Sequence, residues 1–128
     1  MDFLKRFAPH TFALMRIVTG FLFLWHGSQK LFGFPEAGEM PPFVQYVGGS
    51  VEFFGGLLVA IGLFTRVAAF LCSGQMAVAY WTVHAPQALL PIVNQGELAA
   101  LYCFVFLYIA CHGSGIWSVD AARGRAES

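Results

Sequence analysis

Residues 16–32, RIVTGFLFLWHGSQKLF, decide the fold, because they are apolar enough for the interior of a membrane and yet contain three basic side chains. At about 100° per residue, Arg16, His26 and Lys30 fall within a sector of roughly 80° on one helix. A basic residue that faces lipid at mid-depth costs at least about 2.5–3.5 kcal/mol. We therefore expect this polar face to point into a bundle of helices and to have partners there.

The whole chain shares this apolar character. Of its 128 residues, 58% are hydrophobic and only 11% are charged, which places the chain in the membrane class. Seven Lys or Arg residues balance seven Asp or Glu residues, so no net charge favours nucleic acid as a partner. We predict one domain over residues 1–128, with the lipid bilayer as its surroundings.

Four apolar runs predict the architecture. They cover residues 11–32, 46–64, 67–83 and 97–112, and they are separated by two Pro-rich segments and, between the second and third, by Thr65–Arg66. The first run is long enough to cross a bilayer, and the other three reach that length with their flanking residues. It is also too long and too charged for a secretory signal peptide. The prediction is an all-α integral membrane four-helix bundle with up-down-up-down topology.

The distribution of charge predicts the orientation in the membrane. Antiparallel helices place both termini and the turn at 65–66 on one side, and this side holds Lys5, Arg6, Arg66, Arg123 and Arg125. The other side holds Lys30 beside Glu36, Glu39, Glu52 and Glu97. Because cytoplasmic loops are enriched in Lys and Arg, both termini are expected to be cytoplasmic.

Glycine spacing suggests a contact between the first two helices. Gly20 and Gly27 lie seven residues apart on the first helix, and Gly48, Gly55 and Gly62 repeat this spacing on the second. Small residues let two membrane helices approach closely. A tight contact here would bring Glu52 toward Lys30 or His26.

Five ionisable residues are expected to converge near the non-cytoplasmic side. His26 and Lys30 come late in the first helix, Glu52 early in the second, His84 at the end of the third and Glu97 at the start of the fourth. Intramembrane ionisable groups are functional candidates. We interpret Glu52 and His26 as candidate catalytic residues that exchange protons, because burial and neighbouring charges tune such groups.

A second set of residues is expected to bind a ligand. Gln75 lies near mid-membrane and Arg16 lies deeper toward the cytoplasm, so a polar track could run inward from the cluster. The candidate ligand-binding residues are Arg16, Lys30, Gln75, His84 and Glu97. The structural alternative stays open: Lys30 and Glu52 would be an ion pair that fixes helix register, and Glu97 would cap its helix.

The spacing of the His, Glu and Cys residues does not indicate a metal site or a reactive pair of thiols. His26, His84, Glu52 and Glu97 are acceptable ligand types for a transition metal, but no two of them lie at i, i+3 or i, i+4 on one helix. The site prediction therefore includes no metal. Cys72, Cys103 and Cys111 form neither a C-x-x-C pair nor a zinc spacing, so we interpret them as small apolar core residues.

Taken in order, several short motifs carry a family resemblance. They are "HG" at 26–27, "KLFG" at 30–33, Glu52 with "FFGG", Gly62 with "LFTR", "VHAPQ" at 83–87, "GELA" at 96–99 and "GSGIWSVD" at 113–120. With Arg16 and Gly20, this pattern resembles the DoxX family of small bacterial membrane proteins over nearly the whole chain. The resemblance implies a four-helix protein of the bacterial inner membrane, in a family related to quinone-linked oxidoreductase subunits. It carries over no catalytic residues.

These observations lead to a functional expectation. The chain is expected to be a redox-associated subunit that binds a quinone or a similar lipophilic small molecule near the non-cytoplasmic side. No cofactor is encoded, and redox or membrane subunits, or further copies of the chain, are the expected partners. The alternative is a non-catalytic accessory or assembly subunit of a membrane oxidoreductase complex. A small transporter that uses the track from Glu52 through Gln75 to Arg16 is a third possibility.

Overall fold

The computed structural model describes residues 1–125, and this part of the chain contains helices and loops but no strand, which confirms the all-α class. The last three residues of the domain expected over 1–128 lie outside the described residues. The long helical segments are α2 (Ala8–Phe32), η1 with α3 (Val44–Gly48 and Gly49–Ile61), α4 with η2 (Thr65–Ala79 and Tyr80–His84) and α6 (Glu97–His112). Three short helices are α1 (Asp2–Lys5), α5 (Pro91–Asn94) and α7 (Val119–Ala122).

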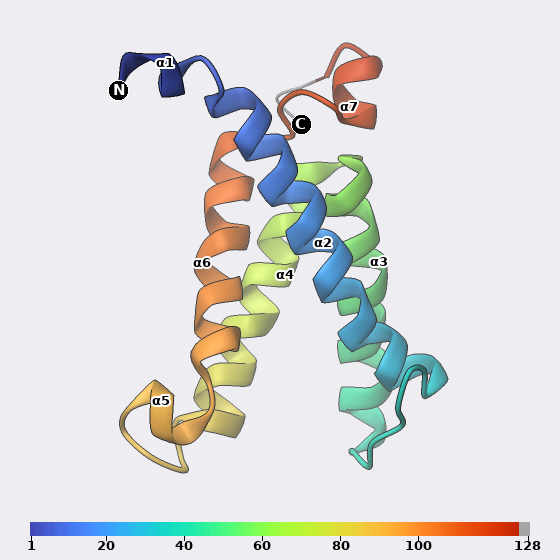
Figure 1. Cartoon of the computed structure of the whole chain (residues 1–128). Helices are drawn as coiled ribbons and strands as arrows, with labels where there is room; N and C mark the ends of the chain where they lie inside the picture. Colours follow the sequence, from blue (N-terminus) through green and yellow to red (C-terminus); the bar gives the residue numbers. More distant parts are fainter. Residues whose placement is uncertain (126–128) are drawn as a thin grey trace.

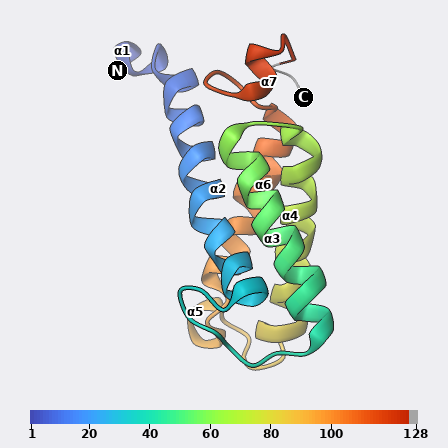
Figure 2. The ribbon, with the colours of Figure 1, turned by 90° about the vertical axis from the view of Figure 1, so that its right-hand side faces the viewer.

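Successive long segments run in opposite directions, so both chain termini lie at one end of the bundle (Figure 1). We call this the terminal end; it holds residues 1–10, 62–66 and 113–125. The opposite loop end holds residues 33–48 and 80–96, and the view from the side shows the same division (Figure 2). Because α2 packs mainly against α3 and α4 packs mainly against α6, the bundle is built from two helix pairs. The distance between the two pairs increases toward the loop end, so the pairs diverge there (Figure 1).

Two of the segments are long and apolar enough to cross a membrane by length and composition. They are Ala8–Phe32, with 25 residues, and Val44–Ile61, with 18 residues. The second reaches this length because the π-helical turn η1 continues directly into α3. Helix α6, Glu97–His112, is a shorter apolar helix.

Glycines set the distance between α2 and α3. A Cβ atom built on Gly27 would lie 2.2 Å from the backbone nitrogen of Phe53, and one on Gly20 would lie 2.6 Å from the carbonyl oxygen of Gly56. The contact is reciprocal, since a Cβ atom on Gly56 would lie 2.9 Å from the carbonyl oxygen of Gly20. The two backbones therefore touch where any side chain would separate them, as the spacing of Gly20 and Gly27 predicts.

Of the three glycines expected to face α2 from the second helix, Gly55 faces a different helix. A Cβ atom on Gly55 would lie 2.5 Å from the Cys72 sulfur atom of α4, so Gly55 faces α4. Gly48 lies between Gln75 of α4 and Lys30 of α2, since a Cβ atom there would be 3.5 and 3.8 Å from their side-chain nitrogens. Gly62 ends α3 in the left-handed conformation, with φ +74°, beside the Arg16 guanidinium. The physical reason is that α3 carries glycines on two faces, one for each neighbouring helix.

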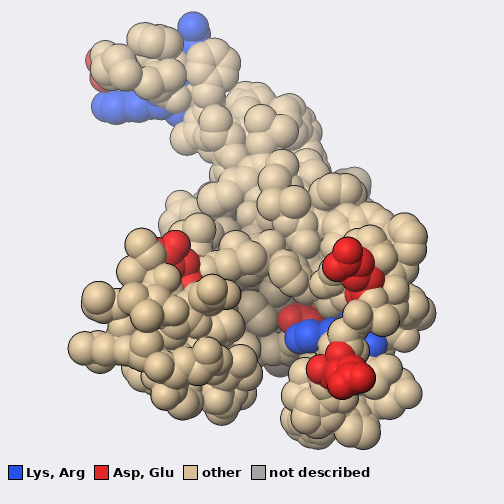
Figure 3. Space-filling view, turned by 60° about the horizontal axis from the view of Figure 1, so that its bottom comes forward, with Lys and Arg blue, Asp and Glu red and all other residues tan. Residues whose placement is uncertain are grey.

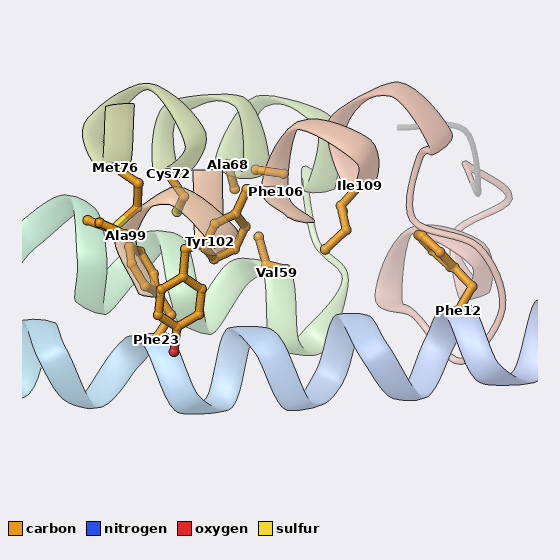
Figure 4. Packing of buried hydrophobic residues seen from close by; sticks show 11 residues of the cluster. Phe12, Phe23, Val59, Ala68, Cys72, Met76, Ala99, Tyr102, Phe106 and Ile109 are labelled. Carbon is orange, nitrogen blue, oxygen red and sulfur yellow. The ribbon is translucent and has the colours of Figure 1, made fainter. Parts of the chain in front are cut away.

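Aromatic rings fill the space between α2 and α6 halfway along the bundle. The ring of Phe23 lies 5.0 Å from that of Tyr102 and 4.7 Å from that of Phe106, measured between centroids. All three side chains are buried. Figure 4 shows Tyr102 extending from α6 toward α2, while Phe12 lies apart from this group toward the terminal end. This aromatic layer closes the bundle above the point where the helix pairs diverge.

Arg16 holds the C-terminal segment against the bundle. Its side chain is fully buried. Nε donates to the carbonyl oxygen of Val59 at 3.1 Å, and Nη1 donates to those of Ser114 and Ile116 at 2.8 and 3.2 Å. Nη2 donates to the carbonyl oxygen of Trp117 at 2.7 Å. We call Arg16 with these four carbonyl groups the C-terminal clasp, which uses most of the planar fork of donors of a guanidinium.

Asp120 caps helix α4 from the same C-terminal segment. Its buried carboxylate accepts hydrogen bonds from the backbone nitrogens of Phe64 and Thr65 at 3.1 and 3.2 Å, and from the Thr65 hydroxyl at 3.0 Å. An anion is favourable at a helix N-terminus, where backbone N–H groups lack partners. Helix α4 therefore begins at Thr65, two residues before the apolar run. The same bonds hold Phe64 at φ 49°, a conformation that is costly for a residue with a side chain.

Candidate functional site

A cleft of about 620 Å³ opens at the loop end, between the two helix pairs. Its apolar wall includes Phe23 of α2, Val44 of η1, Met76 of α4 and Leu98 of α6, so all four long segments contribute. Figure 3 looks at this end, where two lobes flank a hollow; the basic side chains and most of the acidic ones lie on one side of it, and a further acidic patch lies on the other lobe. The polar side chains that line the cleft include His26, Lys30, Glu52, His84, Gln95 and Tyr102.

The ion pair between Lys30 and Glu52 is the most buried charged group of the cleft. The ammonium nitrogen donates to Oε1 of Glu52 at 2.8 Å and lies 2.7 Å from Oε2. The Glu52 side chain is only 3% exposed, whereas that of Lys30 is 23% exposed. Gly49 explains the approach, because a Cβ atom there would lie 2.9 Å from Cβ of Lys30. The glycine contact between α2 and α3 thus places the two charges side by side.

One oxygen of Glu52 keeps hydrogen-bonding capacity. Oε2 is buried and, within residues 1–125, has no hydrogen-bond partner of suitable geometry, although the Lys30 ammonium is in ion-pair contact with it. An ionised carboxylate accepts at about four lone-pair positions, and a buried acceptor without a donor costs about 1–3 kcal/mol. Because Oε2 is closed off from the cleft and lies 2.7 Å from the ammonium, the part of the pair that a molecule in the cleft can reach is the partly exposed Lys30 side chain.

His26 and Tyr102 face each other on the α2 and α6 sides of the cleft. Their rings lie 5.9 Å apart between centroids in an edge-to-face arrangement. Tyr102 is 7% exposed, and within the described chain neither its hydroxyl group nor the His26 ring nitrogens make a hydrogen bond. The Tyr102 hydroxyl oxygen, unlike Oε2 of Glu52, keeps some exposure, and Tyr102 lines the cleft. Both residues can therefore offer polar atoms to a molecule in the cleft.

His84 is held in a defined orientation by Asn94. Nδ1 of His84 lies 3.1 Å from the carbonyl oxygen of Asn94, which can only accept, so Nδ1 carries the proton. In the neutral ring Nε2 is then an acceptor. Asn94 is itself buried and donates from Nδ2 to the Tyr80 hydroxyl at 3.3 Å and to the carbonyl oxygen of Ala88 at 3.1 Å. The loop between η2 and α6 thereby fixes the His84 ring at the edge of the cleft.

Three expected site residues lie outside the cleft. Arg16 belongs to the C-terminal clasp, where backbone carbonyl groups bind its guanidinium. Gln75 donates from Nε2 to the carbonyl oxygen of Gly48 at 3.0 Å and lines a separate cavity of about 310 Å³, which it shares with Lys30. Glu97 is exposed in the first turn of α6. The polar track expected from Glu52 to Arg16 is therefore interrupted, because both inner residues bind backbone groups.

Tyr102 is the main cleft residue that sequence reasoning missed. It lies in the apolar run 97–112, where an aromatic residue is expected to serve in packing. A signal was present, since a Tyr hydroxyl in the middle of a membrane helix needs a polar partner. The residues described also contain no group of three or more His, Cys, Asp or Glu side chains placed to hold a metal ion.

Long apolar helices around a buried ion pair define a small membrane protein with a mostly apolar cleft at one end of its bundle. The family model DoxX matches residues 11–85, and the chain belongs to this family of membrane proteins. The chain is 38% identical to an "Uncharacterized protein" of Haemophilus influenzae, over 94% of this chain and 96% of that protein. It is 31% identical to "Putative oxidoreductase CatD" of Bacillus subtilis, over 84% of this chain and 82% of that protein. No solved structure matches the chain.

Proposed function

We propose that the protein crosses the bacterial inner membrane four times, with both termini in the cytoplasm and the cleft open toward the non-cytoplasmic side. The charge of the two ends supports this orientation. The terminal end carries Lys5, Arg6, Arg66, Arg123 and Arg125, whereas Lys30 is the basic residue of the loop end and is paired with Glu52. Membrane proteins place Lys- and Arg-rich segments in the cytoplasm.

The proposed function of the cleft is to bind a quinone or quinol as part of a redox-associated membrane subunit. The observation that carries this proposal is the Glu52–Lys30 pair, which lines a cleft with apolar walls and exposes part of the Lys30 side chain to it. A volume of about 620 Å³ is in the range of small-molecule sites, which are mostly apolar with a few placed polar groups. A relative named "Putative oxidoreductase CatD" supports a redox role.

The chain's own residues would orient such a molecule and handle its protons. Lys30 and His26 would donate hydrogen bonds to a ring oxygen, and Glu52 would accept a proton or a hydrogen bond from a ring hydroxyl. Phe23 would pack against the ring from the aromatic layer. A bound quinone or quinol supplies two-electron redox chemistry, and a partner protein would supply or remove the electrons.

The second candidate function is that of an accessory or assembly subunit without chemistry. The observation that favours it is that Lys30 and Glu52 also join α2 to α3, as a structural ion pair would. In this case Glu52→Gln lowers the stability of the bundle or the assembly of a complex and changes no ligand occupancy. Under the quinone proposal, Glu52→Gln leaves a folded protein that has lost its ligand.

Mass spectrometry of organic extracts from gently solubilised, purified protein tests the proposed function. Quinone per protein is compared among the wild type, Glu52→Gln, the exposed loop-end variant Glu36→Gln and an unrelated four-helix membrane protein. We expect near-stoichiometric quinone in the wild type and in Glu36→Gln, and a large loss in Glu52→Gln. Wild-type quinone no higher than in the unrelated protein contradicts the proposal and favours the accessory role.

A further inference from the structure

A second cavity of about 310 Å³ adjoins the cleft at the loop end, between η1 and the segment formed by α4 and η2. We call it the side cavity. Four residues line both spaces, namely Lys30, Val44, Ala79 and Val83. The cleft and the side cavity are therefore separated by no more than one layer of side chains.

The rest of the side cavity is mostly apolar and opens at the outer surface of the bundle. Its remaining lining residues are Phe43, Val47, Gly48, Gln75, Val78 and Thr82. Val47 is 48% exposed and Val78 is 62% exposed, so both apolar side chains form part of the rim. The elements on either side include the π-helical turns η1 and η2, and such turns are rare and frequent at functional sites. These surroundings suit a hydrocarbon chain better than a polar ring.

Lys30 lies where the two spaces meet. A Cβ atom on Gly48, which lines the side cavity, would lie 3.8 Å from the Lys30 ammonium nitrogen and 3.5 Å from Nε2 of Gln75. The hydrogen bond from Gln75 to the Gly48 carbonyl oxygen joins α4 to η1 on the side away from the loop end. Glu52, in contrast, lines the cleft and not the side cavity. A polar group that binds Lys30 in the cleft is therefore next to an apolar space.

We propose that the side cavity holds the hydrocarbon chain of the molecule whose ring lies in the cleft, and that this chain leaves the protein between η1 and η2. This inference rests on the proposed function and adds to it a binding site for the chain, so that the ligand is a ring with a long apolar side chain. A chain that left through the loop end would be exposed to water, whereas the side cavity keeps it against apolar side chains. The competing route is the gap between α2 and α6, because the helix pairs diverge there (Figure 1).

Photo-crosslinking of the wild-type protein distinguishes the two routes. The probe is a benzoquinone with a ten-carbon chain that ends in a diazirine. It is irradiated with purified protein in lipid nanodiscs, with and without an excess of the same quinone lacking the diazirine, and the crosslinked residues are identified by mass spectrometry. We expect crosslinks that the excess quinone suppresses at residues 43–48 and 75–83. Suppressible crosslinks confined to α2 and α6, or none at all, overturn this inference.

A variant that narrows the side cavity tests the same point by affinity. Val47→Phe changes a residue that lines the side cavity and not the cleft, and Val93→Phe, at an exposed position of α5, is the matched control. Each protein is titrated in nanodiscs with the ten-carbon quinone and with the same ring bearing a methyl group. The ratio of the two affinities is compared between proteins, so that partition of the chain into lipid cancels.

We expect Val47→Phe to weaken binding of the ten-carbon quinone at least about tenfold, because the chain loses apolar contacts, and to leave binding of the methyl quinone unchanged. Val93→Phe is expected to keep the wild-type ratio. A wild-type ratio in Val47→Phe overturns this inference and leaves the proposed function standing. If the wild-type protein binds neither quinone saturably, the proposed function fails, and this inference with it.

Discussion

Nη2 of Arg16 donates a 2.7 Å hydrogen bond to the carbonyl oxygen of Trp117, although 101 residues separate the two positions. The bond joins the first long helix to the segment that follows the last one. Asp120 adds a second attachment through the backbone of Phe64 and Thr65. The C-terminal segment is therefore an integral part of the fold. Arg16 binds backbone groups of this segment rather than a ligand.

Arg16→Lys is expected to lower the free energy of unfolding by about 2–3 kcal/mol, because an ammonium cannot reproduce the planar fork and leaves buried carbonyl groups without donors. Denaturant unfolding in detergent measures this change. Arg6→Lys, at an exposed position, is the control. An Arg16→Lys protein that unfolds at the wild-type midpoint would contradict the stabilising role of the C-terminal clasp. If that protein also lost its ligand, Arg16 would have to be a ligand-binding residue.

Asp120→Asn is expected to destabilise the protein by about 1–2 kcal/mol, the usual range for loss of a helix cap. The amide keeps one acceptor oxygen but loses the charge that interacts with the N-terminus of α4. Amide hydrogen exchange should become faster at Phe64 and Thr65, whereas Asp2→Asn, at an exposed position, leaves it unchanged. Equal protection of these two amides in wild type and Asp120→Asn would show that the cap adds nothing.

Two glycine-to-alanine substitutions should have opposite effects. Gly27→Ala places a methyl group 2.2 Å from the backbone nitrogen of Phe53 and is expected to cost at least about 1–3 kcal/mol, since α2 and α3 must separate. Gly74→Ala meets nothing within 4 Å in the interior of α4 and is expected to gain about 0.5–1 kcal/mol. Thermal unfolding of both variants checks the pair. A stabilised Gly27→Ala would disprove the close contact.

Tyr102→Phe removes a hydroxyl group without changing the aromatic layer. We expect unchanged unfolding, because within residues 1–125 this hydroxyl makes no hydrogen bond, and a loss of roughly 3–10-fold in affinity for the bound ring. Titration in nanodiscs measures the affinity, with Tyr108→Phe, at an exposed position of α6, as the control. Full affinity in Tyr102→Phe would place the ligand away from α6.

The proposed orientation predicts which positions an impermeant maleimide reaches in intact spheroplasts. In a background without the three native cysteines, Glu36→Cys should react from outside, because the loop end is proposed to be non-cytoplasmic. Asp2→Cys should react only after the membrane is permeabilised. Both positions are exposed, so access alone decides the result. The reverse pattern would invert the topology and place the cleft on the cytoplasmic side.

Helix periodicity, depth and glycine spacing predicted that Glu52 lies near Lys30 or His26, and the structure pairs it with Lys30. The helix face of Lys30, the early position of Glu52 in the next helix and the seven-residue spacing of Gly20 and Gly27 together leave few other partners. The positions of Arg16 and Tyr102 were not predictable in this way. Arg16 is satisfied by carbonyl groups, and every residue has one, so no side-chain pattern marks its partners.

The sequence by itself determined that the protein is all-α, where its long helices lie to within a few residues, and that Glu52 of the second lies near the basic residues of the first. These features follow from hydrophobicity and from a helical period that is fixed for every chain. Only the tertiary structure decided that α3 uses Gly49 and Gly56 against α2, that Arg16 closes the terminal end, and that Tyr102 shares a cleft with Glu52. Such relationships depend on how helices rotate and separate when they pack, and this is set by contacts among residues far apart in the sequence.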